Sequence, residues 1–316
     1  AFRPLDLGIY PVLVRSAARR ELDPTTYSFL LRNRAIGVAL ITALFAGYSA
    51  MTRAENALLL TCFFFANGLP VVHELPRAVM AGHERFESLA RMNLVTKAIE
   101  SAIATAGLLL GFGLPAWLLG RLVSHGVFVF IATRYAADEL GQDRVPSTGT
   151  LASSFGVLRK GFVFFLTRLL DVASARIGVL LVTAHAGLNG AAQLGLSSKI
   201  HMAVLGLLGA ATQIAYPRLA RDRERAIGVR PLALLVGLSM LLGLGVYVAA
   251  PVAVRVLVGR WDPVMTTVVR TAAPVLTMVA VSRPLELWLE AKDHERAVLA
   301  IAAVSSVVSI AGTTWL

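Results

Sequence analysis

The sequence predicts an all-α, multi-pass integral membrane protein built from two helical lobes. Three observations support this fold class: an apolar composition, a series of uncharged stretches long enough to cross a bilayer, and basic residues that recur on alternate sides of those stretches. The chain is 56% hydrophobic and 16% charged, with a mean hydropathy of +0.70. Soluble domains are less apolar and about 25% charged. The composition therefore argues against a soluble enzyme.

A first helical segment ends near Val14, and nine spans of about 17–25 residues follow it. Two boundaries are difficult. Only Gly113-Leu114-Pro115 separates the third span from the fourth, and we place a tight turn at Asn189-Gly190 in an otherwise uncharged stretch. The expected apolar cores are 35–50, 57–75, 92–113, 116–136, 161–183, 191–216, 231–258, 264–289 and 298–316.

The basic residues test this division, because cytoplasmic loops of membrane proteins are enriched in Lys and Arg. If the loop after Val14 is cytoplasmic and the sides alternate, twenty Lys and Arg fall on the cytoplasmic side and three on the other. The net charge of +11 then needs no nucleic-acid partner. The cytoplasmic set is Arg15, Arg19, Arg20, Arg32, Arg34, Arg77, Arg85, Arg91, Lys97, Arg134, Arg144, Arg159, Lys160, Arg218, Arg221, Arg223, Arg225, Arg230, Lys292 and Arg296, and the opposite set is Arg53, Arg255 and Arg260.

Short motifs recur at nearly constant spacing and indicate an internal repeat. Tyr10-Pro11 matches Tyr216-Pro217, and His83-Glu84-Arg85 matches His294-Glu295-Arg296. Glu74-Leu75 likewise matches Glu286-Leu287. The matched motifs are an even number of spans apart, so the two halves run in the same direction across the membrane.

The repeat and a polar connector define the expected domains. Residues 1–137 form an N-terminal lobe, residues 138–154 a cytoplasmic linker, and residues 155–316 a C-terminal lobe. A complete repeat would have six helices in each lobe. We therefore expect the chain to be truncated at both ends, without the first span, most of the second and the last.

Charged residues inside the spans of the second half form the candidate substrate cavity: Arg168, Asp171, Arg176, Lys199, Arg270 and Arg283. Charges at membrane depth are costly and normally face a protein interior or a wet cavity. This set, counted with Glu286, is net positive and suits an anion such as a diphosphate, for which Arg is a planar multidentate donor. Two simpler interpretations stay open: an ion pair within the helix for Arg168 and Asp171, and snorkelling to the interface for Lys199 and Arg270.

Two glutamates, Glu74 and Glu286, are the candidate gating or coupling residues. Each lies toward the cytoplasmic end of a span that contains prolines, Pro70 and Pro76 in one case and Pro274 and Pro284 in the other. Interrupted helices at matching positions of two halves indicate a moving element. A plain interfacial charge is the simpler alternative for both glutamates.

No sequence pattern indicates catalysis, a cofactor or a metal site. The chain has no phosphate-binding loop, no nucleophile elbow and no His-Glu-x-x-His motif. His73 could relay protons beside Glu74, although packing explains it as well, and Arg121 and His125 remain undecided. We expect Glu100 to pair with Lys97 three residues before it. The single cysteine, Cys62, is expected to be a buried filler.

The stretch from Leu170 to Arg221 resembles the polysaccharide-export flippases (Wzx type) of the MOP superfamily. The resemblance rests on Ala-Arg-Ile-Gly-Val-Leu-Leu, Gly-Leu-Ser-Ser-Lys and the closing Tyr-Pro-Arg-Leu-Ala-Arg. It implies a V-shaped, two-lobe transporter that passes undecaprenyl-diphosphate-linked oligosaccharides outward across the bacterial inner membrane. Its partners would be the lipid-linked anionic glycan, membrane lipids, and glycan polymerase or ligase components. We expect this chain to lack the family's first helix, which helps to line the cavity, and therefore not to transport by itself.

Other interpretations remain open. A lipid II flippase or a MATE-like cation antiporter of the same superfamily is the nearest, although an antiporter needs acidic residues to dominate its cavity. A multi-pass glycan ligase or acyltransferase is a candidate of another class, but it would need a polar loop with catalytic residues, and the outer loops here are short.

Overall fold

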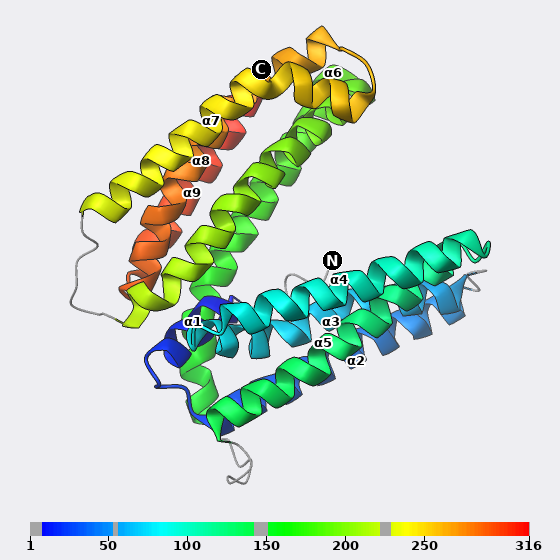
Figure 1. Cartoon of the computed structure of the whole chain (residues 1–316), viewed down its shortest axis with the longest axis vertical. Coiled ribbons are helices and arrows are strands. Elements are labelled where there is room, and N and C mark those ends of the chain that lie inside the picture. Colours follow the sequence, from blue (N-terminus) through cyan, green and yellow to red (C-terminus); the bar gives the residue numbers. More distant parts are fainter. Residues whose placement is uncertain (1–7, 53–55, 142–150, 222–228, 316) are drawn as a thin grey trace. The chain divides into compact units, whose positions relative to one another are not determined.

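A computed structural model describes residues 8–52, 56–141, 151–221 and 229–315 of the chain (Figure 1). Within these ranges the chain is helical and contains no strand, which confirms the all-α prediction. It divides into two compact units, Ala1–Phe165 and Leu166–Leu316. The helices are α1 (Ile9–Ala18), α2 (Pro24–Met51), α3 (Ala57–Gly82), α4 (Phe86–Leu109), α5 (Leu114–Leu140), α6 (Leu151–Arg221), α7 (Val229–Val258), α8 (Pro263–Ala291) and α9 (Glu295–Trp315).

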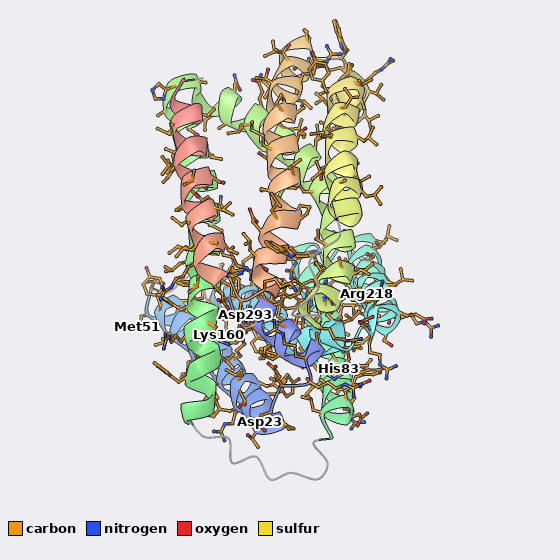
Figure 2. All side chains as sticks on the ribbon, turned by 90° about the vertical axis from the view of Figure 1, so that its left-hand side faces the viewer. Asp23, Met51, His83, Lys160, Arg218 and Asp293 are labelled. Carbon is orange, nitrogen blue, oxygen red and sulfur yellow. The ribbon has the colours of Figure 1, made fainter. Side chains whose placement is uncertain are left out.

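Each expected span coincides with a helix or with half of one, and several helices extend beyond the apolar core. Helix α2 begins at Pro24, well before residue 35, because Asp23 caps it. The Asp23 carboxylate accepts hydrogen bonds from the backbone N–H groups of Thr25 (3.3 Å) and Thr26 (3.2 Å). An acceptor at this position satisfies donors that the first turn leaves open. Figure 2 labels Asp23 at this end of α2.

In the part of the chain that the structure describes, four helical stretches are long and apolar enough to cross a membrane, judged by length and composition. They are Pro24–Met51, Ala57–Gly82, Leu114–Leu140 and Val236–Val258.

The long helix α6 consists of two helical segments that meet at Gly187. Its φ of 68° and ψ of −169° are not helical. A positive φ of this kind is open to glycine and disfavoured for other residues. The chain reverses direction there (Figure 1), so the division of this apolar stretch into two spans is confirmed. The break lies two residues before the expected turn at Asn189-Gly190, because Gly187 adopts the non-helical conformation.

In the first unit, α3 is the central helix: it packs against α1, α2 and α5, and α5 packs in turn against α4. The contacts are close because small residues lie at the crossings. A Cβ atom at Gly82 would lie 2.5 Å from the Ala17 Cβ and 2.8 Å from the Val14 carbonyl oxygen of α1. At Gly120, a Cβ atom would lie 2.8 Å from the Glu100 carbonyl oxygen of α4.

In the second unit, α7 packs along α8 through a cluster of buried side chains. Leu196 and Ile200, from the second segment of α6, pack against the same cluster. The cluster therefore joins three helices of this unit around one apolar centre. Its buried members are Val246, Ala250, Val254, Met265, Val269 and Ala273.

Helices α3 and α8 end in the same kind of turn, and its register differs from that of the matched sequence motifs. The N–H of Arg85 donates to the Met80 carbonyl (2.9 Å), and the N–H of His294 donates to the Leu289 carbonyl (2.9 Å). Both pairs span five residues, the six-to-one bond of a Schellman motif. The turn therefore aligns Arg85 with His294, whereas the sequence motif aligned His83 with His294.

This register corrects the expected equivalence of the two glutamates. Counted back from the shared turn, Glu74 corresponds to Arg283, and Arg77 corresponds to Glu286. The two helices thus carry charges at the same two positions with opposite signs. The sequence motifs placed Glu74 opposite Glu286 because short Glu-Leu and His-Glu-Arg matches happen to lie two or three residues out of the structural register.

Candidate functional site

The first unit contains a buried cation–carboxylate contact between α2 and α3. The Arg34 side chain is 7% exposed, and its Nη1 donates to the Val71 carbonyl oxygen at 2.9 Å. The same nitrogen lies 3.8 Å from the Glu74 Oε2. Arg34, assigned from the sequence to the cytoplasmic basic residues, lies inside α2 because that helix begins at Pro24. It therefore fixes the α2 helix to the proline-containing half of α3.

Two imidazoles stack between α3 and α5. The ring centroids of His73 and His125 lie 5.3 Å apart, with an interplanar angle of 20°. Phe128 covers His73 with its ring centroid at 4.6 Å. The histidines are 8% and 9% exposed, and neither Nδ1 atom has a hydrogen-bond partner among the described residues. Buried polar atoms are usually satisfied, so a pair of this kind calls for an explanation.

A third group of polar residues links α5 to α4. The Lys97 Nζ donates to the Glu100 Oε2 at 2.6 Å, which confirms the pair expected from their spacing. The Arg121 Nη1 lies 4.0 Å from the other carboxylate oxygen of Glu100, and its guanidinium lies over the Trp117 ring at 5.3 Å. Because Arg121 and His125 are one helical turn apart, this group continues directly into the histidine pair.

These three groups follow one another as a polar network through the first unit, buried at Arg34 and at the histidines and exposed at Lys97. It has cations at both ends, two carboxylates, and the stacked histidines in the middle. The network crosses α2, α3, α5 and α4 in that order, by way of Arg34, Glu74, His73, His125, Arg121, Glu100 and Lys97.

Only one member of this network, Glu74, was among the candidate site residues from the sequence. The stacked pair joins residues far apart in the chain, so no local pattern could show it. Two signals were nevertheless present: His73 lies between Pro70 and Pro76, and Arg121 and His125 share one face of α5. These features indicate polar residues that face the interior on α3 and on α5. Only the fold shows that His73 and His125 stack on each other.

In the second unit, Arg270 is held by α7 and Lys199 is exposed. The Arg270 Nε donates to the Tyr247 carbonyl oxygen at 3.2 Å, and its guanidinium lies over the Tyr247 ring at 5.3 Å. Lys199 precedes Ile200, which packs on the α7–α8 cluster, and Arg270 follows Val269 of that cluster. Each cation is thus the chain neighbour of a residue in or on the same apolar cluster, on a different helix.

The other candidate residues are spread along α6 and α8. Arg168 and Arg176 are exposed on the first segment of α6, and Glu286 is half-buried on α8. The side chains of Asp171 and Arg283 lie outside the described residues, as do most of the expected linker and Arg223 and Arg225. The structure thus gives the positions of these residues on their helices and leaves the shared cavity a hypothesis.

Within the described residues, no group of three or more His, Cys, Asp or Glu side chains is arranged to hold a metal ion.

No family model matches this chain, and no curated protein matches it. Solved structures do match, at low sequence identity and over nearly the whole chain. A point mutant of the Vibrio cholerae MATE transporter VcmN has a TM-score of 0.66 and 15% identity, and the match covers 98% of this chain and 73% of that one. An outward-facing multidrug resistance MATE family transporter of the MOP superfamily has a TM-score of 0.68 and 14% identity, over 97% and 73% of the two chains.

A MOP superfamily transporter from Pyrococcus furiosus matches with a TM-score of 0.66 and 14% identity, over 99% of this chain and 77% of that one. All three neighbours are transporters rather than enzymes. The fold is therefore that of MATE transporters of the MOP superfamily. Together with the apolar helices, it is the fold of a multi-pass membrane protein.

Proposed function

From this transporter fold, we propose that the protein is a flippase that moves an undecaprenyl-diphosphate-linked oligosaccharide outward across the bacterial inner membrane. The proposal rests on the fold, on the sequence resemblance to polysaccharide-export flippases, and on the sign of the charges in the second unit. The charge is the observation that distinguishes this function from others on the same fold.

The second unit has a surplus of basic residues within its spans. Arg168, Arg176 and Lys199 are exposed on α6, Arg270 lies on α8, and Arg283 adds a further cation. A diphosphate keeps its negative charge at neutral pH and accepts paired hydrogen bonds from guanidinium groups. In our proposal Arg168, Arg176 and Arg283 bind the diphosphate, Asp171 orients the arginine beside it, and Lys199 and Arg270 raise the local potential.

Pocket polarity is a reasonable discriminator within this fold. For the Pyrococcus furiosus neighbour, reverse polarity of the binding pocket suggests a different function. By the same reasoning, a basic cavity favours an anionic cargo here. Membrane lipids and glycan polymerase or ligase components would be the partners that deliver and consume that cargo.

The test is flipping of a fluorescent undecaprenyl-diphosphate sugar by the full-length protein in proteoliposomes. Arg168→Ala and Arg176→Ala should each slow flipping about tenfold or more, since a hydrogen bond to a charged group contributes roughly 1.5–3 kcal/mol. Arg→Lys variants should recover part of the rate, because an ammonium group cannot reproduce the planar fork. Arg255→Ala, in the last turn of α7, is the matched control. Normal flipping by both alanine variants would contradict the assignment.

A MATE-like cation antiporter is the second candidate, because multidrug MATE transporters are among the structural neighbours. The same vesicles discriminate the two functions. The antiporter would be favoured if the protein transports a lipophilic cationic dye, if Arg168→Ala does not change that transport, and if the diphosphate lipid is not flipped.

A further inference from the structure

The stacked pair of His73 and His125 differs from the rest of the polar network. Every other member is an ion or a partner of one, whereas the two imidazoles contact each other and His73 also contacts Phe128. Both are nine-tenths buried, and both Nδ1 atoms lack partners within the described part of the chain. We propose that this pair is a proton-binding site that controls the bending of α3.

The geometry allows the pair to take up a single proton. Two imidazolium ions with centroids 5.3 Å apart would repel each other strongly in a buried site. One imidazolium stacked on a neutral imidazole is acceptable when an anion or water compensates its charge. The two rings would therefore titrate as a coupled unit, with separated steps for the first and second protons.

Charged groups surround the pair on every side. The charge of Arg77 of α3 interacts electrostatically with His73. The charges of Arg121 of α5 and of Lys97 and Glu100 of α4 interact in the same way with His125. On the α2 side, Arg34 lies beside Glu74, and on the α1 side Tyr10 lies near Glu74 and Arg77. Cations outnumber carboxylates in this set, so a proton on the pair needs water or a rearranged carboxylate to stabilise it.

The helix that carries His73 is built to bend at that point. Pro70 and Pro76 lie on either side of His73 within α3. Each proline removes one backbone N–H donor and favours a kink. Helix α5, which carries His125, has a proline only in its first turn. Bending of α3 at these prolines would separate the two rings and admit water, while α5 stays straight.

Proton uptake and bending are then coupled. A proton binds better to the separated, hydrated rings than to the stacked, buried ones, so it shifts the population toward the bent form of α3. Loss of the proton restores the stack. As part of the transport cycle, this coupling rests on the proposed transport function, but proton binding by the pair does not require any substrate.

The first experiment uses histidine labelled with ¹⁵N in the full-length protein in nanodiscs. The imidazole signals of His73 and His125 should titrate in coupled steps, and His125→Gln should shift the titration midpoint of His73. His185→Gln is the matched control, since His185 is exposed near the α6 turn. Independent titration of the two rings, unaffected by the partner's replacement, would overturn the proposal.

The second experiment measures transport in proteoliposomes at pH 6 and pH 8. His73→Asn and His125→Gln should bring the ratio of the two rates close to one, while His185→Gln should keep the wild-type ratio. A wild-type ratio of the two rates in both His73→Asn and His125→Gln would contradict the coupling between the histidine pair and transport. If a single variant does not fold, the double variant His73→Phe/His125→Leu replaces the pair by apolar side chains and gives the same comparison.

These outcomes separate the two proposals. Coupled titration without movement of the diphosphate lipid would overturn the proposed cargo and support the proton site. Normal flipping of the diphosphate lipid with independent titration of the two histidines would support the proposed cargo and overturn the proton site.

Discussion

Glu84 and Asp293 have the same left-handed backbone conformation, with φ angles of 58° and 64°, at the same position of the turns after α3 and α8. Figure 2 labels Asp293, and it labels His83, the residue that precedes Glu84 in the chain. Neither residue is a glycine, although a non-glycine residue in this conformation costs roughly 1–2 kcal/mol. The two turns thus share their geometry, while the helices before them carry charges of opposite sign at matching positions.

This conformation predicts an unusual order of stability. At position 84, Glu84→Gly should be more stable than Glu84→Val by roughly 1–2 kcal/mol, because valine is strained at positive φ. Asp293→Gly and Asp293→Val should show the same order. Thermal unfolding in detergent measures it. At Glu87, in the first turn of α4, the order should reverse, since glycine costs about 1 kcal/mol in a helix. Equal stability of the two variants at position 84 would contradict the assigned turn.

The contact between α1 and α3 at Gly82 should tolerate no side chain. Gly82→Ala would place a Cβ against Ala17 and the Val14 carbonyl, at an expected loss of about 1–3 kcal/mol. Gly126→Ala is the control, because no atom lies within 4 Å of a Cβ at that site. It should be neutral or should stabilise the protein by up to about 1 kcal/mol. Unfolding temperatures that fall equally for both variants would refute the close packing.

The Asp23 cap should make stability depend on pH. Hydrogen bonds, chiefly from the Thr25 side chain, lower the pKa of Asp23 in the folded protein. A lowered folded pKa stabilises the fold above the unfolded pKa of about 4, and this contribution is lost as the pH falls through the folded value.

The corresponding variants are Asp23→Ala and Asp23→Asn. Asp23→Ala should cost about 1 kcal/mol at pH 7 and less at pH 3. Asp23→Asn should keep most of the cap and lose this pH dependence. Unfolding curves at the two pH values measure both effects, and an alanine variant that is as stable as the wild type at pH 7 would rule out the cap.

The charge asymmetry predicts the sidedness of the loops. In a Cys62→Ala background, a cysteine at Asn189, beside the α6 turn, should react with an impermeant thiol reagent in intact cells. A cysteine at Asp143, in the expected linker, should stay unlabelled until the membrane is opened. The reverse labelling pattern would invert the topology.

Glu74 and Glu286 should behave differently from each other when neutralised. Glu74→Gln weakens the charge contact with Arg34 and should slow transport and flatten its pH dependence while leaving lipid binding intact. Glu286 corresponds in register to Arg77, so Glu286→Gln should alter a different step and should not reproduce the Glu74 effect. Flipping rates over a pH series check this, with Glu87→Gln of α4 as the control. Indistinguishable profiles for the two variants would restore the symmetric role.

The sequence predicted the helices well, because their signals are local. Apolar length gave each span, whereas the start of α2 at Pro24, capped by Asp23, was not among the expected boundaries. Even the hidden boundary in α6 was placed within two residues, since a glycine-rich turn has few alternatives. Local signals also misplaced the register of the repeat. Short motifs can match in residue type by chance, whereas the structural register is set by the hydrogen bonds of the turns at Glu84 and Asp293.

The sequence by itself determined an all-helical membrane protein and a surplus of basic residues in the second half, because composition, span length and charge order are properties of the chain alone. Only the tertiary structure decided that Arg34 is buried against Val71 and Glu74, that His73 stacks on His125, and that Arg270 is held by Tyr247. Each of these contacts joins residues on different helices. Its existence depends on which helix faces are turned toward each other, and that is set by the packing of whole helices rather than by any local pattern in the chain.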